Sequence, residues 1–225
     1  LESGESESYV SSVVEGFVMP HTLLHLGFAG RHLNDYLIDL LSKGKGYHFA
    51  SISMRDIAQD IKEKLCYVAE DFNQEIKNAA DGYDSEVLYE LSGGDVIALG
   101  KERFQVPEAL FQPSLMGRDK VGIHKGIMSS ISKCTDDDTR RNLLGNIVIC
   151  GGTTLFPGLA DRISCEVKKL NKNEASVNIV ALADRKYAAW KGGSILSSIM
   201  TFQQMWITRD QYNQLGPKSV HRALH

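Results

Sequence analysis

Apolar and polar positions along the chain follow two different periods, which separate predicted strands from predicted helices. The clearest junction lies at residues 147–158, where a short apolar run meets Gly151 and Gly152. Beyond it, apolar residues recur at helical spacing and form one face: Leu159, Ile163, Val167 and Leu170. This order predicts a buried strand, a glycine turn and an amphipathic helix.

The same periods predict the remaining elements. Helical spacing or helix-start residues mark the ranges 33–41, 53–77, 107–111, 123–134, 139 onward and 187–200. Alternating or continuous apolar runs mark two strands around a turn at Gly4, a hairpin at 87–99 and a strand at 177–180. We expect Pro107 in the first turn of its helix, and close packing or a ligand at Gly192 and Gly193, because glycine disfavours a helix interior.

Strands and helices alternate at both ends of the chain, whereas residues 30–118 are mostly helical with one hairpin. The pattern therefore predicts an α/β fold into which a mainly helical α+β subdomain is inserted.

Composition narrows the classes of function. The chain has 225 residues, 43% of them hydrophobic and 24% charged, which is typical of a soluble globular protein. A net charge of −3 gives no basic field for nucleic acid, and no apolar run has the length of a membrane helix. The four cysteines are far apart and stand mostly in apolar runs, which favours buried thiols in a reducing compartment.

Local patterns leave several candidate sites open. A strand, glycine turn and helix suit nucleotide binding, because glycines admit a close ligand and a helix start offers free N–H groups; a tight turn that binds nothing is the alternative. Lys62 and Glu63 lie off the apolar stripe of their helix, as surface charges or as groups that face a cleft. The run Asp136–Asp138 is explained by a helix start, with a metal site as the less favoured alternative.

Six segments together resemble the actin family. They are DIKEKLCYV (60–68), PEALFQPS (107–114), GGTTLFPG (151–158), RKY (185–187), WKGGSIL (190–196) and TFQQMWI (201–207). They stand in the family's order, run across the chain and correspond to the C-terminal part of a family member.

This resemblance implies the actin-like ATPase (ribonuclease H-like) fold. Residues 1–28 and 119–187 would form the inner subdomain of the pointed-end half, and 29–118 the small outer subdomain inserted into it. Residues 188–225 would belong to the barbed-end subdomain whose body precedes this sequence in the family. The resemblance further implies ATP or ADP with Mg²⁺ or Ca²⁺ as cofactors.

Site residues carried over by the resemblance come from four segments. The phosphate hairpin would comprise Ser3, Gly4 and Glu5, with Glu2 contacting the metal through water. The adenosine site would comprise Gly30, Lys62, Glu63, Gly151, Gly152, Thr153, Leu155, Phe156 and Lys186. No residue of this chain is expected to act as a catalytic residue.

Several positions depart from the family pattern. The hairpin reads Glu2-Ser3-Gly4-Glu5-Ser6 where the family has Asp-Ser-Gly-Asp-Gly, Tyr9 replaces a histidine, and Gln59 replaces an arginine. Because phosphoryl transfer depends on accurate positioning, we expect weak or no ATP hydrolysis by this chain alone. Arg118 replaces an apolar residue in the loop that packs between strands of the family's filament.

The leading hypothesis is an ATP-binding, cytoplasmic cytoskeletal subunit that forms filaments at full length. It would bind other actin-like subunits and, through an apolar groove formed by Gly16, Phe17, Leu196, Ile199 and Met205, the amphipathic helices of actin-binding proteins. The alternative is a non-polymerising actin-related scaffold that docks partners through this groove. A sugar kinase of the same superfamily is disfavoured, because no sugar-binding signature is present.

Overall fold

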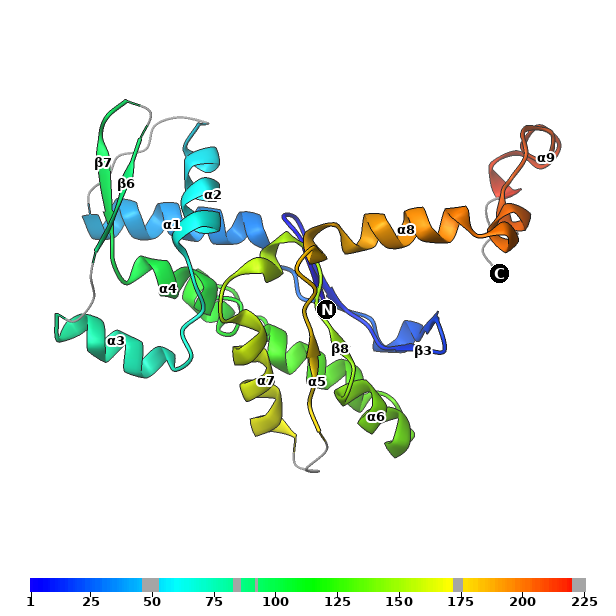
Figure 1. The fold of residues 1–225 in the computed structure, drawn as a ribbon, viewed down its shortest axis with the longest axis horizontal. Coiled ribbons are helices and arrows are strands. Elements are labelled where there is room, and N and C mark those ends of the chain that lie inside the picture. The colour runs from blue at the N-terminus through cyan, green and yellow to red at the C-terminus, as the bar shows by residue number, and fades with distance from the viewer. Residues whose placement is uncertain (46–52, 83–85, 92, 172–175, 220–225) are drawn as a thin grey trace. The chain divides into compact units, whose positions relative to one another are not determined.

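A computed structural model describes residues 1–45, 53–82, 86–91, 93–171 and 176–219. The chain divides into two compact units, Leu1–Lys186 and Tyr187–His225, called here the larger and the smaller unit. The larger unit contains the strands and seven of the described α-helices (Figure 1).

Short strands form the centre of the larger unit. β1 (Glu2–Ser3), β2 (Ser8–Val10) and β5 (Leu24–His25) make an antiparallel sheet in the order β1-β2-β5. β8 (Ile147–Val148) and β9 (Ile179–Val180) pair in parallel, and a parallel bridge from Glu2 to Cys150 joins the two sets. The hairpin turn at Gly4 thereby comes beside the turn that follows β8.

Helices surround these strands in two groups. α1 (Gly30–Lys45), α2 (Ser53–Leu65), α3 (Phe72–Ala80) and α4 (Glu102–Glu108) pack on one another, and the β6–β7 hairpin (Val87–Glu90, Val96–Leu99) lies near α2 (Figure 1). α5 (Ile123–Ser132) packs against α6 (Asp137–Leu144) and α7 (Leu159–Leu170), and α7 packs against β9. A single apolar core joins both groups, with Leu37 of α1, Ile127 of α5 and Ile163 of α7 fully or almost fully buried.

Connecting segments complete the larger unit. A second hairpin pairs β3 (Val13–Val14) with β4 (Phe17–Val18). Short 3₁₀ turns cover Pro20–Thr22, Pro113–Met116, Gly152–Leu155 and Arg185–Tyr187.

The smaller unit is helical over its described residues. It contains α8 (Ala188–Ser198), a 3₁₀ turn at Met200–Met205, α9 (Arg209–Leu215) and a final turn at Gly216–Ser219. Thr208 caps α9 in a capping box with Gln211. The last residues of the predicted C-terminal segment, 220–225, lie outside the described part of the chain.

The predicted helix at 53–77 is wrong in its extent. α2 ends at Leu65, and α3 begins at Phe72 with the Asp71 carboxylate as its N-cap. Between them, Tyr67 N donates to Arg103 O and Val68 N to Pro157 O, at 3.1 and 2.9 Å. These tertiary hydrogen bonds take the backbone donors that a continuous helix would use, so residues 66–71 form a non-helical joint between α2 and α3.

Three smaller predictions are also corrected. Pro107 lies in the last turn of α4 rather than in the first turn of a helix, and β9 is shorter than the range 177–180. A Cβ built on Gly192 or Gly193 meets no described atom within 4 Å, so close packing is not found there among the described residues, and the alternative, a ligand, stays a prediction. The predicted N-cap run is confirmed, because Asp136 accepts from Thr139 N at 2.7 Å.

All four cysteines are free; Cys66 and Cys134 are buried, as the sequence predicts, whereas Cys150 and Cys165 are only partly buried. Cys66 is the first residue of the joint at 66–71, and it is 3% exposed. Its burial raises the pKa of the thiol to about 12.

Candidate functional site

The turn between β1 and β2 is fixed by backbone hydrogen bonds on both sides. Gly4 N donates to Glu7 O at 3.0 Å within the turn, and Ser3 N donates to Cys150 O at 2.9 Å across to the segment after β8. The Ser3 and Ser8 hydroxyls lie 2.8 Å apart, so the buried Ser3 side chain bonds within the hairpin. The hairpin that we predicted around Ser3, Gly4 and Glu5 is therefore a rigid turn.

The start of α1 meets this turn directly. Gly30 N donates to Gly4 O at 3.0 Å, Arg31 N to Glu5 O at 2.8 Å, and the Thr153 hydroxyl to Gly4 O at 2.7 Å. A Cβ on Gly30 would lie 2.7 Å from Thr153 Oγ1 and 2.8 Å from Glu5 Oε2. Thr153 and Glu5 would have to move to admit a side chain at Gly30, and the contact brings four predicted site residues together: Gly4, Glu5, Gly30 and Thr153.

The paired glycines approach the same turn from the other side. Gly151 has a φ of 93°, and a Cβ there would lie 2.2 Å from Ser3 O. Gly151 N donates to Arg185 O at 3.0 Å. This hydrogen bond places Lys186, the residue after Arg185, beside Gly152. A Cβ on Gly152 would lie 3.8 Å from Lys186 Cγ, so the lysine stem crosses this glycine.

The expected free helix start is not at these glycines. A 3₁₀ turn at Gly152–Leu155 follows them, and α7 begins only at Leu159. At α1, the first two N–H groups are already bound to the hairpin carbonyls. Helix dipoles therefore contribute less to this site than the sequence pattern suggests.

Lys62 is buried, which corrects its reading as a surface charge. The residue is 3% exposed, and its Nζ donates to Gly30 O at 3.1 Å, with Glu5 Oε2 at 3.9 Å. Burial lowers the pKa of Lys62, and the Glu5 carboxylate opposes this shift. An ammonium group has three donors, so this cation has donor capacity for an anionic group beside Gly30.

The other predicted site residues differ in exposure. Glu63 is exposed and accepts from Gln59 Nε2 at 2.8 Å, while Glu2 is exposed at the end of the sheet. Leu155 is exposed, whereas Phe156 packs in the apolar core. Their predicted contacts with adenosine and with a metal-bound water stay predictions.

Asn34 is a site neighbour that the sequence analysis missed. Its Nδ2 donates to Glu5 Oε1 at 3.5 Å, and its Oδ1 is buried without a hydrogen-bond partner in the structure. Asn34 follows Leu33 on the buried side of α1, where the helical pattern indicates only core packing. The sequence offered one indication of this role, namely that Asn34 is a polar residue at a position of α1 where an apolar one is expected.

The predicted apolar groove draws residues from both units and stays a prediction. In the larger unit, Gly16 has a φ of 85° at the β3–β4 turn, and Phe17 is 78% exposed. In the smaller unit, Leu196, Ile199 and Met205 are exposed. Each side thus presents apolar side chains to solvent.

The described residues contain neither a cluster of metal ligands nor a helix that could span a membrane. His, Cys, Asp and Glu side chains form no group of three or more that can hold a metal ion there. Likewise, none of the helices described has the length and apolar character needed to cross a membrane.

Comparison with known families gives one assignment for the whole sequence. The chain matches the family described as Actin over residues 1–225. Members of this family generally bind a nucleotide with a divalent cation, and they have the actin-like ATPase fold. The mixed α/β architecture of this chain agrees with that fold. The chain therefore belongs to the actin family.

Proposed function

We propose that this chain is part of an ATP-binding, cytoplasmic cytoskeletal subunit that forms filaments at full length. The observation that carries the proposal is the convergence of three backbone segments on a buried lysine. The β1–β2 turn, the start of α1 and the Gly151–Gly152 turn meet within hydrogen-bond distance beside Lys62.

The chemistry around Lys62 suits a phosphate group. A buried ammonium group with one carbonyl acceptor and a distant carboxylate gains from a further anion nearby. A Cβ at Gly151 would collide with the Ser3 backbone, and one at Gly30 would meet the Thr153 and Glu5 side chains, so glycine at both positions lets the three segments pack closely.

Adenosine is the expected neighbour of that phosphate. The base would lie across Gly152, Thr153, Leu155 and Phe156, with the stem of Lys186 above the glycine. The exposed Glu63 carboxylate, held by Gln59, is an acceptor of the kind that a ribose hydroxyl requires. Glu2 would contact Mg²⁺ or Ca²⁺ through water, since exposed carboxylates suit hydrated divalent ions.

Direct binding of a fluorescent ATP analogue tests the proposal. We expect etheno-ATP with Mg²⁺ to bind this chain saturably and Lys62→Met to abolish that binding. Lys64→Met is the matched control, because Lys64 is on the same helix but pairs with Asp60 at the surface, at 2.7 Å. Absence of binding by the wild-type chain at millimolar nucleotide would contradict the proposal.

Hydrolysis by the chain alone is expected to be weak or absent. Ser6 and Tyr9 differ from the family residues beside the phosphates, and the longer Glu2 side chain alters the metal contact. A phosphate-release assay should give no rate above the buffer value, and a clear turnover would show that these departures are tolerated.

A non-polymerising scaffold is the second candidate, favoured by one contact. Arg118 Nη1 donates to Gly27 O at 3.1 Å, which ties the loop at Leu115–Met116 to its own chain. A loop held in this way is less available to a neighbouring subunit. Sedimentation with ATP and Mg²⁺ separates the candidates: the scaffold predicts that wild type stays soluble and that Arg118→Met gains assembly. No gain on this substitution would remove its support.

A further inference from the structure

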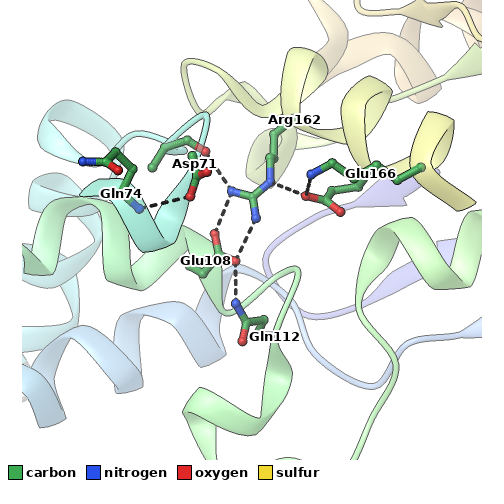
Figure 2. A network of polar contacts seen from close by, with 8 residues as sticks. Asp71, Gln74, Glu108, Gln112, Arg162 and Glu166 are labelled. Atoms are coloured by element: carbon green, nitrogen blue, oxygen red, sulfur yellow. Dashed lines mark hydrogen bonds and ion pairs between the residues drawn. The ribbon is translucent and has the colours of Figure 1, made fainter. Parts of the chain in front are cut away.

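Arg162 is a buried cation outside the candidate site, and every side of its guanidinium has a partner. On α7, its Nη1 and Nη2 bind Glu108 in bidentate fashion at 3.1 Å each, and its Nε donates to Glu166 at 2.9 Å (Figure 2). Nη1 also donates to the main-chain carbonyl of Ala69 at 2.8 Å. The guanidinium carbon lies 4.9 Å from the centre of the Phe111 ring.

These partners come from three different segments. Glu108 ends α4, Ala69 lies in the joint at 66–71 after α2, and Glu166 is one turn further along α7. Glu108 is fully buried and also accepts from Gln112, so the carboxylate is itself fixed in place. Figure 2 shows the guanidinium at the point where these segments meet.

The joint at 66–71 is the structural link between the two walls of the candidate site. At one end it continues from α2, which carries Lys62 and Glu63. On its other side it packs on the residues after the glycine turn, because Val68 N donates to Pro157 O at 2.9 Å. A Cβ on Gly158 would lie 2.5 Å from Val68 O, so these two segments are in direct contact.

From these contacts we propose that Arg162 is a positioning residue for nucleotide binding. It fixes the end of α2 against the segment after Gly151–Gly152, and so sets the separation between Glu63 and the paired glycines. The inference rests on the proposed nucleotide site. Arg162 does not touch the ligand in this account; it acts through Ala69 and Glu108.

The choice of arginine agrees with this role. A guanidinium offers five N–H donors in a planar fork, so one side chain can bind a bidentate carboxylate, a second carboxylate and a main-chain carbonyl at once. A lysine supplies a single point charge and cannot hold that geometry. Lysine at 162 would keep the charge while losing the fixed relation of the three segments.

The test compares etheno-ATP binding by wild type with that by Arg162→Lys and Glu108→Gln. We expect affinity to fall by about tenfold in each, a coupling of the size seen for residues that act through neighbours. Bound etheno-adenosine should also become more accessible to acrylamide quenching, because its two walls are no longer held together. A purely structural role would lower the unfolding midpoint without changing the quenching of the bound ligand.

Arg140→Met is the matched control. Arg140 likewise joins a main-chain carbonyl, Cys134 O at 2.6 Å, to a carboxylate, Asp137 at 2.8 Å, but it lies on α6, which supplies no site residue. Its removal should lower stability and leave affinity and quenching unchanged. All measurements are made well below the unfolding midpoint of each variant.

Outcomes separate the two proposals. Wild-type binding with unchanged affinity and quenching in both variants overturns the role of Arg162 while the nucleotide site stands. No binding by wild type overturns both. Should Arg162→Lys fail to fold, Glu108→Gln decides, because it keeps an acceptor for the guanidinium and removes only the charge.

Discussion

Lys62 and Arg162 are both buried cations of the larger unit, yet their surroundings differ. Arg162 meets two carboxylates, a carbonyl and an aromatic face. Lys62 meets one carbonyl at 3.1 Å and a carboxylate no nearer than 3.9 Å. A cation with four of its five N–H donors bound and two carboxylate partners holds the fold together, whereas one with a single hydrogen bond among the described residues is suited to a ligand.

The largest expected effect comes from removing the bidentate partner of Arg162, which keeps Glu166 and Ala69 O. Glu108→Ala leaves the guanidinium without its bidentate partner inside the protein, which should lower the free energy of unfolding by about 3–5 kcal/mol. Urea denaturation measures this loss. Asp137→Ala, at an exposed ion pair with Arg140, is the control and should cost less than about 1 kcal/mol. Similar losses in both variants would contradict the special position of Arg162.

Lowering the pH should reduce the free energy of unfolding, because it favours protonation of His124, which packs near Arg162. The His124 ring lies 5.7 Å from the Phe111 ring, and the other partner of Phe111 is the Arg162 guanidinium, in a cation–π contact. The His124 Nδ1 atom is buried and has no hydrogen-bond partner among the described residues. Burial lowers the pKa of His124 from 6.5 to about 4, with Lys125, Arg162 and Lys169 also lowering it and Glu166 opposing.

The sign of this effect follows from proton binding. Between pH 6.5 and about 4 the unfolded chain binds a proton at this histidine and the folded protein does not. Stability should therefore fall as pH is lowered through this range, by about 3 kcal/mol in total. His124→Phe removes that component, so the urea midpoint of wild type should fall relative to that of the variant as pH is lowered through this range. Parallel pH profiles would refute the assignment.

A side chain at Gly30, next to Lys62, should reduce both stability and nucleotide binding. Gly30→Ala places a methyl group against Thr153 and Glu5, and we expect a loss of about 1–3 kcal/mol together with weaker nucleotide binding. Gly44→Ala is the control on the same helix: it meets no described atom within 4 Å and should stabilise α1 by up to about 1 kcal/mol. Thermal unfolding and etheno-ATP binding distinguish the two.

The smallest effect on stability should come from Lys62→Met. Replacing an incompletely paired buried charge by an apolar side chain of similar length should change the free energy of unfolding by less than about 1 kcal/mol, in either direction. Nucleotide binding should nevertheless disappear. A large loss of stability in urea would mean that Lys62, like Arg162, is a structural cation.

Local pattern predicted the elements that are locally determined. The helical face at Leu33, Leu37 and Leu41, the hairpin at 87–99 and the Asp136 cap all appear where the sequence placed them. The extent of α2 was not predictable in this way, because Val68 and Phe72 continue its apolar spacing while the backbone bonds to Pro157 and Arg103. Asp71 was the overlooked signal, since a helix start had to follow it.

The candidate site shows the same division. The glycine turn was visible in the sequence, but the junction depends on tertiary contacts of Gly30 with Gly4 and of Gly151 with Ser3, which no local pattern predicts. The local pattern left Lys62 open between a surface charge and a cleft-facing group, because its burial results from the packing of α1 against α2 rather than from its own helix face. Asn34 gave a single signal, a polar residue at a core position of its helix, and Arg162 gave none.

The high pKa of Cys66 makes this residue a chemical reporter on the joint between α2 and α3. At neutral pH the buried thiol is almost wholly protonated, and a protonated thiol reacts poorly with alkylating agents and oxidants. Labelling of Cys66 in the native protein therefore proceeds through the rare molecules in which this joint has separated from its neighbours. The rate at which Cys66 is labelled therefore reports local opening of the joint, and no cysteine has to be introduced for this measurement.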